Sequence, residues 1–197
     1  MRKRFNKKSN YAFIDSQNLN LSVQNDGWKM HWAKFRTFLK EQYNVEKAFM
    51  FIGYMPEFED MYAQLHEAGY SIVLKQTYDL TKPQPELLKE KELKTLELDK
   101  PKDDQEKHHI KGNVDTDVVL WAMKEMPNYK QAVLVSGDGD FYSLVEHLVG
   151  HKKLKKILTP TGHYSNLFNK YEKYIDRLDK HRKELEYPRH KKRRKKT

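Results

Sequence analysis

The chain has 197 residues, 38% of them hydrophobic, and carries 38 Lys and Arg against 28 Asp and Glu, for a formal net charge of +10. This length suits one domain, and the lack of cysteine excludes disulfides, thiolate zinc sites and cysteine nucleophiles. No apolar run approaches the ~18 residues of a membrane span, and the basic N-terminus lacks the apolar stretch of a signal peptide, so we expect a cytoplasmic protein that makes no use of a membrane.

The positive charge is concentrated at the two ends of the chain. Residues 1–9 carry five Lys or Arg and no acid, and residues 180–197 carry ten against two acids, which leaves the body between them at −3. A basic run of this kind neutralises phosphates without reading sequence, although a solubilising tail has the same composition. We therefore expect a basic arm over 1–9, a domain over 10–180 and a disordered basic tail over 181–197.

Strand and helix signals alternate from the start of the domain. Tyr11 to Ile14 is a short apolar run typical of a buried strand, and Asp15 follows it before Ser16-Gln17-Asn18, which predicts a polar turn. The pattern then predicts, in order, a helix over 31–43, a strand over 47–54, a helix over 57–68 and a strand over 70–75.

Residues 81–110 interrupt this alternation. Pro83, Pro85 and Pro101 punctuate a segment dense in Lys, Glu and Asp, which is too polar for a core element. We predict an insertion that is part helical and part mobile. It precedes an aspartate cluster, so it is either a flap over a site or a passive surface insertion.

Regular alternation resumes after the insertion. The pattern predicts a helix over 114–126, a strand over 131–136, a helix over 141–149 and a short last strand over 155–158. Residues 167–185 predict one more docked helix, with an extended segment over 174–178 as the alternative. Strands alternating with helices predict an α/β fold, a three-layer α/β/α sandwich with a mainly parallel central sheet.

Aspartates fall in three separated clusters that such a sheet brings together: Asp15, then Asp115 and Asp117, then Asp138 and Asp140. The first and third clusters directly follow predicted strands, and open α/β sheets bind ligands at the carboxyl ends of their strands. Converging carboxylates repel one another and raise each other's pKa unless a cation joins them, so the clusters indicate a hard divalent metal, Mg²⁺ or Mn²⁺. A metal-loaded acidic crevice in a basic protein suggests phosphodiester chemistry.

Each cluster taken alone also suits a structural role. Asp15 suits a helix cap or a turn, and Asp115 and Asp117 would complement the dipole of the helix that they open. Asp138 with Gly139 suits a tight turn, with Asp140 capping the next helix. Aspartates that only capped separate helices or turns need not point into one volume. The occurrence of all three clusters at the strand ends of one sheet therefore favours a shared site.

The sequence around these clusters resembles the signatures of a known family, the NYN domain in its LabA-like branch, which belongs with the PIN-like nucleases. The resemblance covers about residues 10 to 160 and is carried by three motifs: Phe13-Ile14-Asp15-Ser16-Gln17-Asn18, Lys111-Gly112-Asn113-Val114-Asp115-Thr116-Asp117 and Ser136-Gly137-Asp138-Gly139-Asp140-Phe141. It implies a PIN-like sandwich and a Mg²⁺- or Mn²⁺-dependent ribonuclease that acts on single-stranded or flexible RNA.

The resemblance also implies roles for individual residues. By position, the metal-binding catalytic acids would be Asp15, Asp115, Asp138 and Asp140, with Asp117 as an auxiliary metal-binding acid. The residues expected to contact the substrate are Asn18, Lys111 and Ser136. Many LabA-like sequences have a further acid in the helix after the second motif, where this chain has Trp121 or its apolar neighbours. This departure implies a second metal that binds weakly or only with substrate.

The alternative function is a regulatory protein without catalysis, which would keep the acids for metal binding or stability and grip RNA through its termini. A phosphatase acting on small phosphoesters is less consistent with basic tails. The sequence leaves the RNA substrate and the oligomeric state open, a homodimer included.

Overall fold

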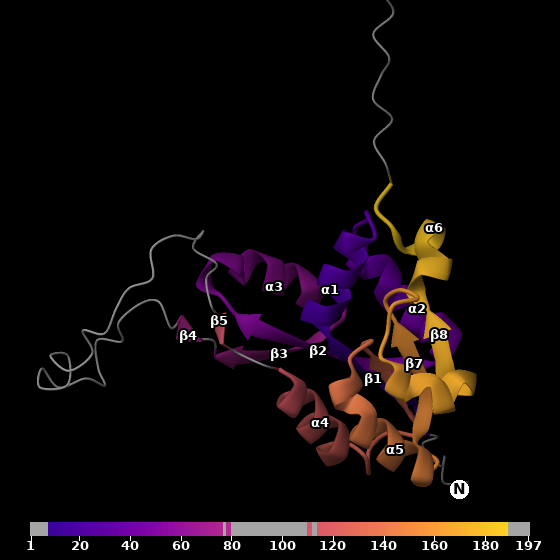
Figure 1. Ribbon diagram of the computed structural model, residues 1–197. Helices are drawn as coiled ribbons and strands as arrows, with labels where there is room; N and C mark the ends of the chain where they lie inside the picture. Colours follow the sequence, from indigo (N-terminus) through magenta and orange to yellow (C-terminus); the bar gives the residue numbers. More distant parts are fainter. Residues whose placement is uncertain (1–7, 77, 80–109, 112–113, 189–197) are drawn as a thin grey trace, which may run out of the picture.

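The computed structural model describes residues 8–76, 78–79, 110–111 and 114–188, and its centre is a six-stranded sheet (Figure 1). All neighbouring strands are parallel, in the order β3-β2-β1-β6-β7-β8. The strands are β1 (Asn10–Asp15), β2 (Val45–Tyr54), β3 (Ser71–Gln76), β6 (Ala132–Val135), β7 (Leu154–Thr159) and β8 (Ile175–Arg177). A separate antiparallel pair, β4 (Tyr78–Asp79) and β5 (Ile110–Lys111), brings the two ends of the insertion side by side.

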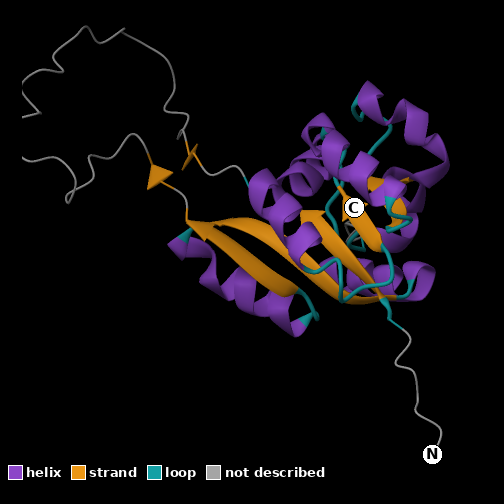
Figure 2. Ribbon diagram, turned by 90° about the horizontal axis from the view of Figure 1, so that it is seen from below, coloured by secondary structure: helices purple, strands orange, loops and turns teal. Residues whose placement is uncertain are grey.

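Helices cover both faces of this sheet, which confirms the predicted three-layer sandwich (Figures 1 and 2). One face carries α1 (Ser16–Asn25), α2 (Trp32–Tyr43), α3 (Glu59–Glu67) and α6 (Arg182–Leu185), and the other carries α4 (Asp115–Lys124) and α5 (Tyr142–Gly150). Short 3₁₀ helices are η1 (Pro56–Phe58), η3 (Gly139–Phe141), η4 (Asn166–Tyr174) and η5 (Leu178–His181). None of the helices in the described ranges has the length and apolarity that crossing a membrane requires.

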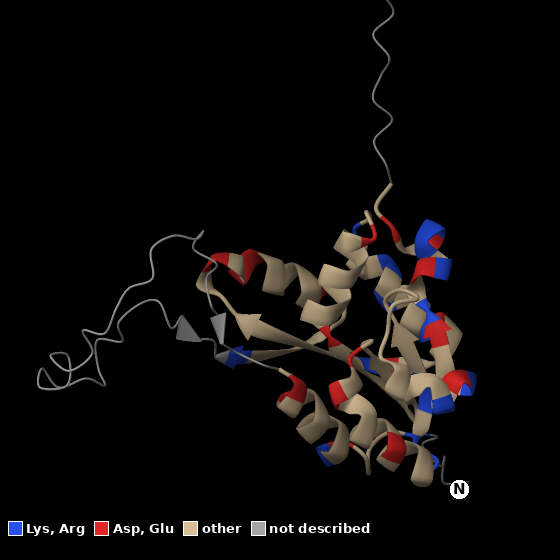
Figure 3. Cartoon of the chain, in the orientation of Figure 1, with Lys and Arg blue, Asp and Glu red and all other residues tan. Residues whose placement is uncertain are grey.

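Alternation along β1 divides the buried core into two clusters. Ala12 and Ile14 pack toward α1 and α2, whereas Tyr11 and Phe13 pack toward α4 and α5. Because successive side chains of a strand point to opposite faces, Asp15 follows Phe13 onto the α4 side. Figure 3 shows acidic residues at the start of α4 and before α5, facing the end of β1.

A helix, α1, takes the place of the polar turn predicted after Asp15, and that prediction was wrong. The Asp15 carboxylate accepts a hydrogen bond from the Asn18 N–H at 3.1 Å and so caps the helix. Leu19 and Val23 are fully buried and lie four residues apart on one face. The first turn is polar because it begins at the ligand-binding edge of the sheet, and the apolar face starts only at Leu19.

The C-terminal part differs most from the prediction. The strand over 155–158 is not the last, since β8 pairs with β7 in parallel, with Ile157 opposite Ile175. The extended alternative for residues 174–178 is therefore confirmed, and the single helix over 167–185 is wrong. An unpaired edge of β7 would leave backbone N–H and C=O groups without partners, and β8 satisfies them.

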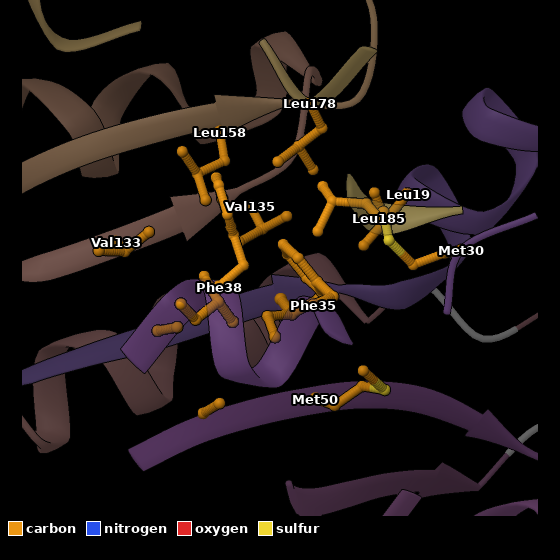
Figure 4. Packing of buried hydrophobic residues seen from close by; sticks show 14 of the residues in the cluster. Leu19, Met30, Phe35, Phe38, Met50, Val133, Val135, Leu158, Leu178 and Leu185 are labelled. Atoms are coloured by element: carbon orange, nitrogen blue, oxygen red, sulfur yellow. The ribbon is translucent and has the colours of Figure 1, made fainter. Parts of the chain in front are cut away.

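The folded chain also continues past residue 180, where the sequence predicted the start of the tail. Leu185 is fully buried in the cluster on the α1 side of the sheet (Figure 4). The His31 N–H donates to the Leu185 carbonyl at 2.8 Å, and the Tyr187 N–H donates to the Lys29 carbonyl at 3.2 Å. One buried leucine and these backbone bonds attach the segment despite its basic composition.

Several predicted features lie outside the described residues: positions 1–7 of the arm, 80–109 of the insertion and 189–197 of the tail, as well as Gly112 and Asn113 of the second motif. The flap role of the insertion therefore stays a prediction. Lys111 lies in β5, and only its backbone is described.

The docking of the C-terminal segment makes a testable prediction about stability. Leu185→Ala is expected to lower the free energy of unfolding by about 2 to 5 kcal/mol, because it leaves a cavity in a packed cluster. The matched control is Leu120→Ala on α4, where the side chain is 58% exposed, and the expected change there is within about 0.5 kcal/mol. Urea unfolding measures both, and equal effects would mean that the segment does not dock as described.

Candidate metal centre

The order of the strands reverses between β1 and β6, which is a topological switch point. From β1 the sheet continues through β2 to β3 on one side and from β6 through β7 to β8 on the other. In open α/β sheets the crevice at the carboxyl ends of such strands is the usual place for a ligand. Strand β1 ends at Asp15, and β6 ends directly before Ser136, so two of the three aspartate clusters flank this crevice.

Three carboxylates converge at the crevice. Asp115, Asp138 and Asp140 each place one oxygen within 4.8 Å of the others. The first of them opens α4, and the other two belong to the loop and 3₁₀ turn between β6 and α5. Asp115 and Asp138 are half-buried and Asp140 is exposed, so the group is accessible to an ion and a substrate from solvent.

Hydrogen bonds connect the end of β1 to the loop after β6. The Ser136 hydroxyl donates to Asp15 Oδ2 at 3.2 Å and accepts from the Asp138 N–H at 3.1 Å. The Asn18 side-chain oxygen accepts from the Gly137 N–H at 3.0 Å. Ser136 is fully buried, so its side chain fixes the loop, and its predicted contact with a substrate stays a prediction. Asn18 is likewise engaged with the loop.

The loop that carries Asp138 is held in a narrow set of conformations. Asp138 Oδ1 accepts from the Asp140 N–H at 3.0 Å and caps η3, so Asp138 and not Asp140 is the capping residue. A Cβ atom on Gly139 would clash with the Ser165 hydroxyl oxygen and would lie 3.2 Å from Leu167 Cδ1. Only glycine fits at that position without a shift of its neighbour, and the motif therefore depends on close packing as well as on its acids.

Asp15, which the sequence predicted as a ligand, is not among the three carboxylates that converge within 4.8 Å. It is only 4% exposed, and both of its oxygens accept hydrogen bonds. Burial is the main reason that the pKa of Asp15 is raised to about 6. The charges of Asp115 and Asp138 contribute to this rise, and the hydrogen bonds from Asn18 and Ser136 oppose it. Asp15 is thus both the helix cap and a buried acid whose charge is coupled to the centre.

Asp117 points to a different partner. Its Oδ2 lies 3.1 Å from the Lys75 Nζ, near the end of β3, and it is not among the carboxylates that converge. Lys75 is a site-edge residue that sequence reasoning missed, because a lysine near the end of a strand carries no motif. The pair places one positive charge next to the acidic centre.

Trp121 lies on α4, in the stretch where the sequence offers no further acid. Its ring lies 5.2 Å from that of Phe49 and 6.4 Å from that of Phe51. The position is therefore part of the packed layer between α4 and the sheet, and it offers no carboxylate to the centre.

The donor set fits a hard divalent cation. Carboxylate oxygens are the ligands that Mg²⁺ prefers, and Mg–O bonds of about 2.1 Å place two ligands of one ion roughly 3 to 4 Å apart. The observed spacing of up to 4.8 Å needs only small side-chain rotations to reach that range. Two of the three acids sit on a short hydrogen-bonded turn, which favours a preformed site.

The geometry predicts different metal affinities for two neighbouring acids. Asp140→Asn is expected to weaken Mn²⁺ binding at least tenfold, because it removes one of the three converging charges. Asp117→Asn makes the same chemical change outside the group and is expected to alter the affinity by less than about threefold, since Lys75 already neutralises that carboxylate. Calorimetric titration with Mn²⁺ measures both, and an equal loss in the two variants would place Asp117 among the ligands.

Comparisons with known proteins bear on the family of the chain. The model of the NYN domain matches residues 11–179, a range that contains all five aspartates of the three clusters. A solved structure of a protein of unknown function from Vibrio parahaemolyticus RIMD 2210633 has a TM-score of 0.62 and 18% sequence identity, and the match covers 95% of this chain and 100% of that chain. At this identity the similarity shows the fold alone. A search of curated proteins found no significant match.

Proposed function

Since this chain belongs to the NYN domain family, we propose that it is a metal-dependent ribonuclease that hydrolyses phosphodiester bonds of single-stranded or flexible RNA. The observation that carries the proposal is the convergence of Asp115, Asp138 and Asp140 at the switch point of a parallel sheet. The motif resemblance further supports placing the chain in the LabA-like branch of the family.

The metal in this proposal is Mg²⁺ or Mn²⁺, held by Asp115, Asp138 and Asp140. When bound, such an ion would stabilise the charge that develops on the phosphate and make water a stronger nucleophile. The open side of the centre faces solvent through the exposed Asp140, which leaves room for a phosphate group of the substrate.

The other residues of the motifs position this centre. Ser136 holds the backbone of Asp138, and Asn18 holds that of Gly137. Asp15 adds negative charge behind the converging acids above about pH 6, where its carboxyl group loses the proton. Affinity for a divalent cation is therefore expected to rise as the pH increases through 6.

The distribution of charge supports RNA as the substrate class. An acidic centre alone repels a polyanion, whereas the five basic residues of the arm and the basic C-terminus attract it. A small phosphoester would gain little from charges at the ends of the chain.

Removal of the tail is expected to change the salt dependence of RNA binding. Residues 189–197 contain seven Lys and Arg and no acid, and each phosphate contact on a single strand adds about 0.7 to the slope of log affinity against log salt. A protein truncated after Pro188 should bind RNA more weakly at low salt and show a slope smaller by about 2 to 4. Equal slopes for the two proteins would contradict a role of the tail in RNA attraction.

Cleavage assays on matched RNA and DNA oligonucleotides test the proposed function. In Mg²⁺ or Mn²⁺ the full-length protein is expected to cut single-stranded RNA, leaving a 5′-phosphate and a 3′-hydroxyl, and to spare DNA of the same sequence. RNA binding without cleavage in either metal would contradict the enzyme and support a regulatory protein that binds RNA.

A further inference from the structure

A cavity of about 300 Å³ lies at the carboxyl edge of the sheet, on the opposite face from α4. It is enclosed by the first turns of α1, by the end of β2 and by η1 and α3. Its inner wall is formed by Met50, Ile52 and Leu65, and its rim by Leu21, Phe58 and Met61. A volume of this size is typical of sites for small organic groups.

The rim exposes apolar surface around this cavity. Leu21 is 50% exposed, Phe58 is 42% exposed and Met61 is 37% exposed. Isolated exposed apolar side chains are ordinary, but a group of them around one concave site marks a place where a ligand binds. Within the described part of the chain, the lining contains no charged side chain, which argues against a phosphate group or an acidic peptide as the occupant.

Polar and aromatic groups of the lining match the edge and the face of a nucleobase. Gln17 and Asn20 lie three residues apart on α1 and line the same cavity. The Gln17 amide offers both donors and an acceptor, which suit the hydrogen-bonding edge of an unpaired base. Asn20 Oδ1 accepts from Gln24 Nε2 at 3.1 Å, so Asn20 contributes the donors of its amide group. Phe58 and Trp32 supply aromatic rings, and bases stack on such rings whatever their identity.

The cavity and the acidic centre share the carboxyl edge of the sheet and flank the end of β1 from opposite faces. Gln17 comes two residues after Asp15, so their Cα atoms lie within about 8 Å of each other. On β2, Phe51 is the register partner of Asp15, and the lining residue Ile52 follows it. One strand of RNA that crosses the carboxyl edge therefore meets both sites.

We infer that this cavity binds one unstacked nucleobase of the RNA, at a fixed distance along the strand from the phosphodiester bond that is cut, with Gln17 and Asn20 at the base edge and Phe58 against its face. The inference rests on the proposed ribonuclease function and adds a subsite to it. It predicts that cleavage at each bond depends on the presence of a base at one fixed distance along the strand.

The experiment uses a single-stranded RNA of about twelve nucleotides with one abasic nucleotide in its middle. The full-length protein is incubated with the end-labelled RNA in Mn²⁺, and the products are compared with those of the intact RNA. At one fixed offset from the abasic nucleotide, cleavage is expected to fall roughly 5- to 150-fold, the range for loss of one stacked base. This weak band is a gap in the cleavage pattern. The position of each cut shows which bond lay in the acidic centre. The result therefore does not depend on where along the RNA the protein binds.

Two double variants show whether the cavity causes this effect. Phe58→Ala with Met61→Ala opens the rim and should remove the gap in the cleavage pattern, because every bond is then cut at the slow rate of the bond that lacked its base. The matched control, Leu120→Ala with Met123→Ala, changes side chains of similar exposure on α4 and should keep the gap.

The outcomes separate this inference from the function on which it rests. A cleavage pattern without a gap, or a gap that persists in the variant with the open rim, would overturn the nucleobase site and leave the ribonuclease standing. No cleavage of intact RNA in Mn²⁺ would overturn the proposed function and this inference together.

Discussion

Replacing Asp138 by asparagine is expected to reduce RNA cleavage in Mn²⁺ by roughly 10³-fold, since one of the converging charges that hold the ion is lost. Asparagine keeps the size of the side chain and an oxygen that can accept the Asp140 N–H, so the turn should keep its shape. The measurement is the single-turnover rate of cleavage of end-labelled RNA.

The control for this prediction is Asp117→Asn, which makes the same chemical change at an acid paired with Lys75 and should cost less than about tenfold. RNA affinity of the Asp138→Asn protein should stay near that of the unmodified protein, because the basic termini are unchanged. Full cleavage by Asp138→Asn would show that the converging acids are not the centre.

Replacing Asp15 by asparagine is expected to stabilise the metal-free protein at pH 7 by about 2 kcal/mol. Burial raises the pKa of Asp15 from its ordinary value of 3.8 to about 6, so the folded chain binds this proton more tightly than the unfolded chain. Below about pH 4 the folded chain keeps the full stability that this proton contributes. As the pH rises through 6 the folded carboxyl group loses the proton, and the free energy of unfolding falls by about 3 kcal/mol. Asparagine stays neutral and avoids that loss, and about 1 kcal/mol is subtracted because the bond with Ser136 must rearrange.

Urea unfolding in EDTA at pH 4.5 and pH 7.5 measures this effect. The unmodified protein should lose stability relative to Asp15→Asn between the two pH values, and the variant should bind Mn²⁺ more weakly at pH 7.5, where Asp15 is ionised in the unmodified protein. Parallel behaviour of the two proteins across this range would mean that Asp15 is not held as a buried acid. A more stable variant with weaker metal binding would indicate that the buried charge is retained for function.

The sequence was sufficient to predict the sheet and the edge at which the acids meet. Apolar runs at β1 and β6 specify buried parallel strands, and each run ends at an acid or directly before an acidic loop. A parallel sheet then places the strand ends together whatever the intervening chain does. The position of the crevice therefore followed from local patterns alone.

Other features depend on contacts that no local pattern contains. The pairing of Asp117 with Lys75 joins α4 to β3 across the insertion, and the apolar cavity joins α1 to α3. Helix α1 was missed because Asp15 acts as its cap and its polar first turn resembles a loop. The sequence predicted strand β8 only as an alternative, because its three residues depend on pairing with β7 for their stability.

The most direct test of the metal-dependent ribonuclease is the rate of RNA cleavage by the full-length protein as the Mn²⁺ concentration is raised from zero in the presence of a chelator. The three converging carboxylates predict no cleavage without free metal and a rate that rises to saturation as the site fills. Cleavage that persists in the chelator, or RNA that is bound and left intact at every Mn²⁺ concentration, would contradict the proposed function.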